Sequence, residues 1–202
     1  IFTREDLTVS NSTISGNTAD KGGGGGIYIR SGTTTVSNST ISGNSAERSG
    51  GGIYNRSGTT TVSNSTISGN TAGQRGGGIY SRYGTTTVSN STISGNTASV
   101  GGGIISINGR ETLSNSIVAG NTLTAGGVAS DITGSSVTGS FNLIGDAATA
   151  GGLTNGTGGN IVGVAWTTVL LNDGTIPTLA DNGGPTQTIA LLAGSPAINA
   201  AS

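Results

Sequence analysis

The sequence predicts an all-β fold in which the chain winds into a β-solenoid, with about 25–27 residues and three short strands in each coil. The first observation is a nine-residue phrase, VSNSTISGN, which begins at Val9 and returns at Val36, Val62 and Val88 with periods of 27, 26 and 26 residues. The second is composition, since 39 of the 202 residues are Gly and β-branched Thr, Val and Ile fill the repeats in place of helix-favouring residues. The net charge is only −1 and the apolar residues recur at fixed places, so the composition indicates an ordered repeat and not a disordered chain.

Three strands are expected in each repeat. In the second repeat they are TTTVS at residues 33–37, STIS at residues 39–42 and GGIYN at residues 51–55. The segment before Gly-Gly-Ile-Tyr varies in length between copies, which is typical of an outward turn. Each strand is expected to pair in parallel with the equivalent strand of the next coil, about 4.8 Å away.

A corner is expected inside the repeated phrase, because Val36 and Ile41 are five residues apart and would face opposite sides of one straight strand. Asn38 is the natural corner, since Asn tolerates the left-handed backbone conformation. Both apolar side chains then point inward, and an aliphatic row is predicted from Ile14, Ile41, Ile67, Ile93 and Val118. The corner amides are predicted to stack as a buried, hydrogen-bonded ladder formed by Asn11, Asn38, Asn64, Asn90 and Asn115.

The predicted domain boundaries lie where the repeat becomes less regular along the chain. Regular repeats are predicted over residues 1–122, the last being the divergent copy LSNSIVAGN. Residues 123–178 keep Gly corners and alternating apolar residues, so they are predicted to continue as irregular coils. Residues 179–202 are predicted to form a C-terminal cap or linker segment, because the open end of a solenoid exposes unpaired strand edges. The same edges make self-association of the chain possible.

The residues that most catalytic and metal sites use are missing from the sequence. The chain has no His, Cys or Met, which removes imidazole bases, thiol nucleophiles and the usual ligands of soft or borderline metals. The spacing of its nine Asp and Glu residues does not pair two carboxylates across a sugar, as glycoside hydrolysis requires. The sequence therefore predicts a protein that is not an enzyme, with no cofactor and no metal site.

The charge and hydropathy of the chain limit the classes of partner that it is expected to bind. A net charge of −1 gives no electrostatic reason to expect nucleic acid, and no apolar run approaches the roughly 20 residues of a membrane span. The first residues, IFTREDLTVS, lack a basic stretch followed by an apolar one. Any secretion signal is therefore expected to have been removed or to lie outside this fragment.

The motif TVSNSTISGNTA, followed by GGGIYN and by LADNGGPTQTIALLAGSPAINAA near the C-terminus, carries a family resemblance. It resembles the right-handed parallel β-helix repeats of bacterial surface proteins, of the choice-of-anchor and polymorphic outer membrane protein types. The resemblance implies a right-handed coil, a secreted or cell-surface location, and a separate anchor outside this fragment. Pectin and alginate lyases and polygalacturonases also use parallel β-helices, so a polysaccharide lyase or hydrolase is a third alternative for the function.

One outward row of side chains is a candidate binding site. Counting by alternation from Ile53, this row combines aromatic and cationic side chains. It is predicted to hold an anionic polysaccharide, with Tyr rings stacked on sugar faces and Arg forks on carboxylate or sulfate groups. The row consists of Tyr28, Arg30, Tyr54, Arg56, Tyr80 and Arg82. The alternative is that cation–π contacts with the Tyr rings only offset the repulsion between stacked arginines.

A second outward row gives an alternative function. Thr35, Thr61 and Thr87, each followed two residues later by Ser, are expected to form a flat hydroxyl face on the strands that contain them. Such a face resembles the water-ordering surfaces of ice-binding solenoids, although hydroxyls also keep an ordinary wall soluble. The predicted function is therefore a non-catalytic secreted or cell-surface β-helix segment that acts as a rigid stalk or adhesive surface, and ice binding is the alternative.

Overall fold

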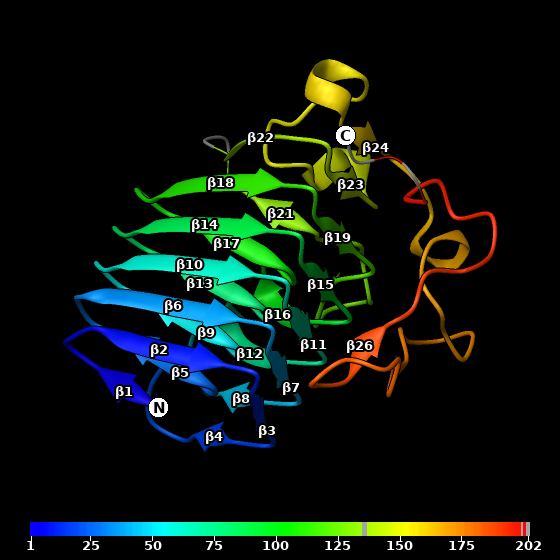
Figure 1. Cartoon of the computed structure of the whole chain (residues 1–202). Helices are drawn as coiled ribbons and strands as arrows, with labels where there is room; N and C mark the ends of the chain where they lie inside the picture. Colours follow the sequence, from blue (N-terminus) through cyan, green and yellow to red (C-terminus); the bar gives the residue numbers. More distant parts are fainter. Residues whose placement is uncertain (135–136, 199, 201–202) are drawn as a thin grey trace.

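The repeats stack as successive coils of a β-solenoid in the computed structural model, which describes residues 1–134, 137–198 and 200 (Figure 1). The coils cross four parallel sheets, which we name A to D. Sheet A contains β1 (Phe2–Thr3), β5 (Ile27–Ile29), β9 (Ile53–Asn55), β13 (Ile79–Ser81), β17 (Ile104–Ser106) and β21 (Ile132–Thr133). Sheet B contains β2 (Leu7–Ser10), β6 (Thr33–Ser37), β10 (Thr59–Ser63), β14 (Thr85–Ser89), β18 (Arg110–Ser114) and β22 (Val137–Ser140). Sheet C contains β3 (Thr13–Ser15), β7 (Thr40–Ser42), β11 (Thr66–Ser68), β15 (Thr92–Ser94), β19 (Ile117–Ala119), β23 (Leu143–Ile144) and β24 (Ile161–Val162). Sheet D contains β4 (Thr18–Ala19), β8 (Ser45–Ala46), β12 (Thr71–Arg75), β16 (Thr97–Val100) and β20 (Thr122–Leu123).

The three strands expected in each repeat are present, and sheet D adds a fourth that the sequence pattern did not indicate. In β8 the inward position is a single Ala, so this strand lacks the large β-branched side chains by which short strands are recognised. The pairing is in register, because Ile41 lies beside Ile67 and Val36 beside Val62. The predicted aliphatic row is confirmed as the core, and its members from Ile41 onward are fully buried.

The asparagine corner is confirmed for the backbone, but the predicted orientation of its side chain is wrong. Asn38 has a φ of 48°, and its equivalents in the other coils share this left-handed conformation. The side chains of Asn11, Asn38, Asn64, Asn90 and Asn115 are all exposed, so they form no buried ladder. The physical reason is that the left-handed residue lies on the outside of the bend, and the next residue, Ser39, takes the buried position.

A buried ladder of amides does run along the solenoid, but it is formed by the Asn that follows Gly in the SGN part of the phrase. Asn70 shows the pattern, since its Nδ2 donates to Oδ1 of Asn96 at 2.9 Å and to the carbonyl oxygen of Ile41 at 2.9 Å. Its Oδ1 accepts the backbone N–H and the side-chain amide of Asn44, both at 3.0 Å. The members are Asn17, which is exposed in the first coil, and the buried Asn44, Asn70, Asn96 and Asn121, and the last amide donates to the carboxylate of Asp131.

The coils continue past residue 122, as expected for the irregular region. β21, β22 and β23 pair with the preceding coil, and β24 pairs with β23. Two short 3-10 helices, η1 (Ala147–Thr149) and η2 (Thr157–Gly159), lie in this region. Among the described residues, no helix has the length and apolar character needed to cross a membrane.

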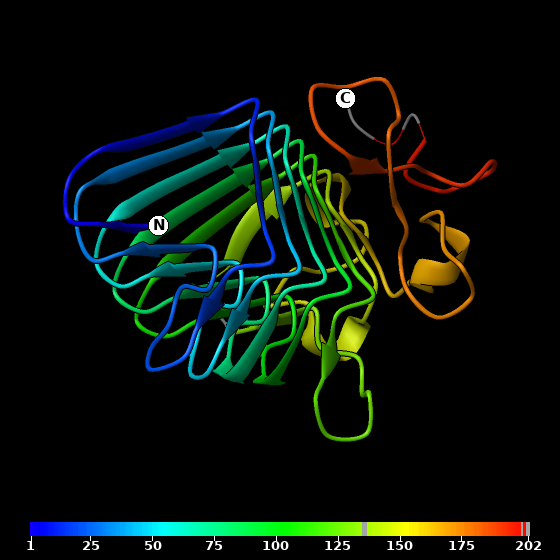
Figure 2. The ribbon, with the colours of Figure 1, turned by 90° about the horizontal axis from the view of Figure 1, so that it is seen from below.

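The chain after Val164 runs along the side of sheet C (Figures 1 and 2). It contains η3 (Trp166–Thr168) and the antiparallel pair β25 (Leu179–Ala180) and β26 (Thr188–Ile189). Val169 and Leu170 pack with Ala119 and Leu143, which lie on the outer face of the coils. We call residues 165–198 the flank segment.

The flank segment corrects two predictions of domain organisation. Residues 179–202 were predicted as a cap or linker, but the described part of this range lies against the side of the coils, where the Thr40 hydroxyl donates to the Gln187 carbonyl oxygen. Residues 165–178 belong to the same segment and not to the irregular coils. The reason is that the outer face of sheet C changes from Thr and Ser to Ile, Ala and Leu in its last coils and so needs covering. Residues 135–136, 199 and 201–202 lie outside the described residues.

Candidate functional site

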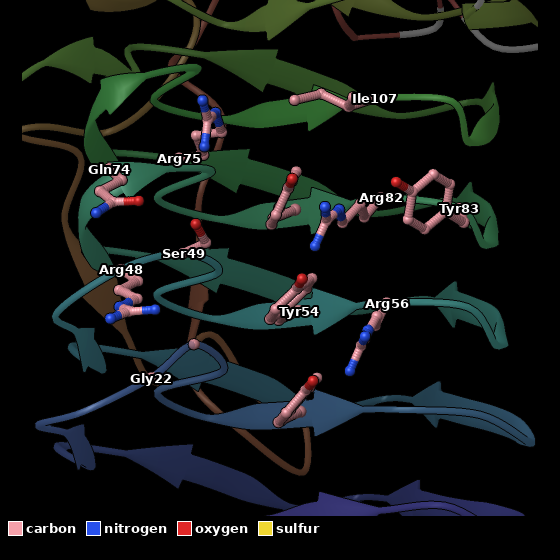
Figure 3. Close-up of a pocket in the computed structure, with 13 residues that line it drawn as sticks. Gly22, Arg48, Ser49, Tyr54, Arg56, Gln74, Arg75, Arg82, Tyr83 and Ile107 are labelled. Atoms are coloured by element: carbon pink, nitrogen blue, oxygen red, sulfur yellow. The ribbon is translucent and has the colours of Figure 1, made fainter.

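A groove with a volume of about 550 Å³ lies on the outer side of sheet A, over β5, β9 and β13 (Figure 3). Its floor is formed by the outward Tyr of each of these strands, because the neighbouring Ile residues point into the core. One bank comes from the turns that lead into the strands, and the other comes from the turns that leave them. We call this site the tyrosine–arginine groove.

The floor is a column of stacked rings formed by Tyr28, Tyr54 and Tyr80. Neighbouring ring centroids are 4.8 Å apart in both steps, with interplanar angles of 9° and 23°. The stacking follows from the register, since Tyr54 pairs with Tyr28 on one side and with Tyr80 on the other. Phe2 meets the edge of the column at Tyr28, with centroids 5.2 Å apart.

The column corrects the predicted mode of sugar recognition. The faces of the middle ring, that of Tyr54, are covered by the rings of Tyr28 and Tyr80, so it has no free face on which a sugar could stack. Burial raises the pKa of the Tyr80 hydroxyl, and the neighbouring Tyr54 adds to this effect. The column therefore offers ring edges and hydroxyl groups to a ligand.

Arginines line both banks of the groove. Arg48 lies on an entering turn and Arg75 is the last residue of β12, directly before the next entering turn, whereas Arg56 and Arg82 lie on the leaving turns. Figure 3 shows Arg48 and Arg75 on one side of the Tyr54 ring and Arg56 and Arg82 on the other. The positive charges of Arg82 and Arg75 both act on the hydroxyl of Tyr80, where they oppose the rise in its pKa without outweighing burial.

The six predicted binding residues do not all lie in the groove. Five of them line the groove, but Arg30 is exposed and is not part of the lining. The predicted cation–π contact between the Arg row and the Tyr column is replaced by another pair, since the Arg82 guanidinium lies 5.0 Å from the ring centroid of Tyr83. Contact with the Tyr54 side chain raises the pKa of Arg82 above its ordinary value.

Sequence reasoning missed five polar residues of the groove, namely Arg48, Ser49, Gln74, Arg75 and Tyr83. Arg48 and Arg75 lie in the segments of variable length before the Gly runs, so they do not occupy equivalent positions in a repeat alignment. The isolated bridge between Ser49 and Arg75 brings these segments together. The available signal was an Arg shortly before the Gly run in two consecutive repeats, AERSGGG and GQRGGG.

The lining of the groove is one-sided in charge. It contains four of the eight Lys and Arg residues of the chain and no Asp or Glu. Like charges this close repel each other unless an anion or solvent offsets them. The groove is thus a local cationic surface on a chain whose net charge is −1.

The structure brings two carboxylates together elsewhere, at the end of the amide ladder. Asp131 is buried and accepts hydrogen bonds from Asn121 and from the backbone N–H of Asp146, while Asp146 accepts from Thr149. Burial raises the pKa of Asp131 to about 6, against the lowering effect of these bonds. Since all four carboxylate oxygens accept hydrogen bonds from the chain itself, this pair serves as a structural cap of the ladder.

A second buried acid lies inside the coils. Glu111 takes the inward position next to Thr86 in sheet B and is 1% exposed. Burial raises its pKa, and the nearby hydroxyls of Ser106 and Ser81 reduce the rise. Within the described part of the chain, its carboxylate oxygens have no hydrogen-bond partner, and no group of three or more Asp and Glu residues is placed to hold a metal ion.

The comparisons with known proteins concern the coils. A family model described as right handed beta helix region matches residues 2–164, which is most of the chain and ends where the flank segment begins. Neither the curated proteins nor the solved structures give a match.

Proposed function

Because the chain belongs to the right-handed β-helix family, we propose that it is a rigid, non-catalytic solenoid segment whose tyrosine–arginine groove binds an anionic polysaccharide. The observation that carries this proposal is the set of four arginines facing one groove that contains no carboxylate. Guanidinium groups hold carboxylate and sulfate through paired hydrogen bonds, which suits them to acidic glycans.

The stiffness of the coils supports a role as a stalk or adhesive surface. Strand pairs run in register through consecutive coils, so the groove is held by backbone hydrogen bonds on both banks. A site placed on such strands keeps its geometry before the ligand arrives, which lowers the entropy lost on binding. A bacterial secreted or cell-surface protein with a separate anchor is the setting that the repeat motif favours.

The test is titration of the protein with an oligosaccharide of uronic acids at low and at moderate salt. Arg56→Ala is expected to weaken binding about fivefold, the loss of roughly 1 kcal/mol for one charge-assisted contact at a half-exposed site. Higher salt should weaken wild-type binding as well, because the contacts are partly exposed.

Arg30→Ala is the matched control, because Arg30 occupies the position equivalent to Arg56 in the neighbouring coil but lies outside the groove. It removes the same charge and should leave affinity within about twofold. Equal losses in the two variants would attribute binding to net charge alone and contradict the assignment of the groove.

Ice binding is a second candidate, and the flat face of Thr and Ser side chains on sheet B favours it. Thr35, Thr61 and Thr87 lie side by side in consecutive coils and are partly exposed, with outward Ser residues beside them. An ice-binding face would shape growing crystals and lower the freezing point below the melting point. Loss of such activity in Thr61→Lys would move this candidate ahead of glycan binding, and its absence in the wild type would remove it.

A further inference from the structure

The groove repeats one arrangement in two consecutive coils. Figure 3 shows an Arg from the entering side and an Arg from the leaving turn on opposite sides of Tyr54, and the charges of Arg75 and Arg82 both act on Tyr80 in the next coil. We call each such set a charged cross-section. The two sets are Arg48, Tyr54 and Arg56, and Arg75, Tyr80 and Arg82.

The coils on either side do not carry this set. One coil below, the lining has Gly22 on the entering turn, and Arg30 on the leaving turn stays outside the groove. One coil above, Ile105 takes the place of the Tyr and Ile107 takes the place of the leaving Arg. The cationic part of the groove is therefore two coils long.

The distance between the charged cross-sections is the rise of one coil. The rings of Tyr54 and Tyr80 give this rise as 4.8 Å along the solenoid axis. Since turns form the banks on both sides, an extended chain fits lengthwise along this axis. Each cross-section has an Arg on both banks, so it can receive an acidic group on either side of such a chain.

We propose that the groove recognises two adjacent acidic groups of a linear glycan, one for each charged cross-section. This inference rests on the proposed function and specifies its ligand as a polymer that carries an acid on every residue. A glycan with an acid on every second residue would fill only one cross-section. The two arginines of the other cross-section would then have no acidic group to bind.

The experiment compares two oligosaccharides of six sugars, one with a carboxylate on every sugar and one in which uronic acids alternate with neutral sugars. The wild type should bind the first about fivefold more tightly, the effect of one additional charge-assisted contact. Arg48→Ala and Arg75→Ala should each remove this preference while both glycans still bind. Arg48 and Arg75 are exposed, so the variants are expected to fold, and their circular dichroism spectra check this.

The outcomes separate this inference from the proposed function. Equal wild-type affinity for the two glycans, with binding still weakened by Arg56→Ala, would overturn the spacing rule and leave the proposed function in place. A preference that survives Arg75→Ala would also overturn it. If neither glycan binds at low salt, both the inference and the proposed function are wrong.

Discussion

Replacement of Asn70 should strongly destabilise the solenoid. Its side chain donates to Asn96 and Ile41 and accepts two hydrogen bonds from Asn44. Asn70→Ala removes a hydrogen-bond partner at three places, which are the backbone N–H of Asn44, one of the two side-chain N–H groups of Asn44, and the carbonyl oxygen of Ile41. The other side-chain N–H of Asn44 keeps its bond to the carbonyl oxygen of Ile14. The acceptor on Asn96 keeps the bond from the Asn70 backbone.

The magnitude follows from the cost of a buried unsatisfied group. Each costs about 1–3 kcal/mol, so three give at least about 3 kcal/mol in the free energy of unfolding. For a chain of this size that corresponds to a fall of roughly 6–12 °C in the melting temperature. Urea unfolding followed by circular dichroism measures the first quantity, and a thermal scan measures the second.

Asn64→Gly is the control, since Asn64 is a corner residue six positions away with an exposed side chain and a φ of 49°. Gly adopts this conformation without strain, so the loss should stay below about 1 kcal/mol. Similar losses in Asn64→Gly and Asn70→Ala would refute the assignment of the buried ladder to the second asparagine.

Glu111→Gln is expected to raise the free energy of unfolding at pH 7, because burial raises the pKa of Glu111 and so disfavours its charged form in the folded state. The cost of burying the charged carboxylate grows as the pH rises above 4.5, the ordinary pKa of Glu. Urea unfolding should therefore show a smaller fall in the free energy of unfolding between pH 4 and pH 7 for the variant than for the wild type. The pKa of Asp131 is raised from 3.8 to about 6, so this group should lower the wild-type free energy of unfolding by about 2 kcal/mol between pH 4 and pH 7, and Asp131→Asn should flatten the profile. Gly120→Ala should displace the flank segment, since its Cβ would lie 2.9 Å from Cγ of Trp166, whereas Gly43→Ala has a similar positive φ and no atom nearer than 4.0 Å. Emission from the single Trp should shift to longer wavelength in Gly120→Ala only, and equal spectra would contradict the packing described.

Much of the fold could be predicted because the repeat itself encodes the stacking. A fixed period places each residue on its counterpart, so the strands around Val36 and Ile41 and the buried aliphatic row followed from spacing. The ladder could not be assigned in the same way, because Asn38 and Asn44 recur with the same period. Only the backbone conformation decides that the first faces solvent and the second faces the core.

The site was partly predictable for a related reason. Tyr54 and Arg56 belong to the regular part of the repeat, so alternation along the strand placed them on the outer face. The stacking of the Tyr rings upon one another, which removes the faces a sugar would use, depends on the distance between coils. Arg48 and Arg75 line the groove from segments whose length and course the repeat pattern does not determine.

By itself, the sequence determined the parallel, in-register coil, because repetition makes every strand the natural partner of its own copy one coil away. The tertiary structure decided where the flank segment lies, since Thr40 and Gln187 are 147 residues apart and no local pattern relates them. It also decided that four arginines meet in one groove without a carboxylate among them. Both outcomes depend on contacts between segments that differ in sequence, which the period of a repeat does not constrain.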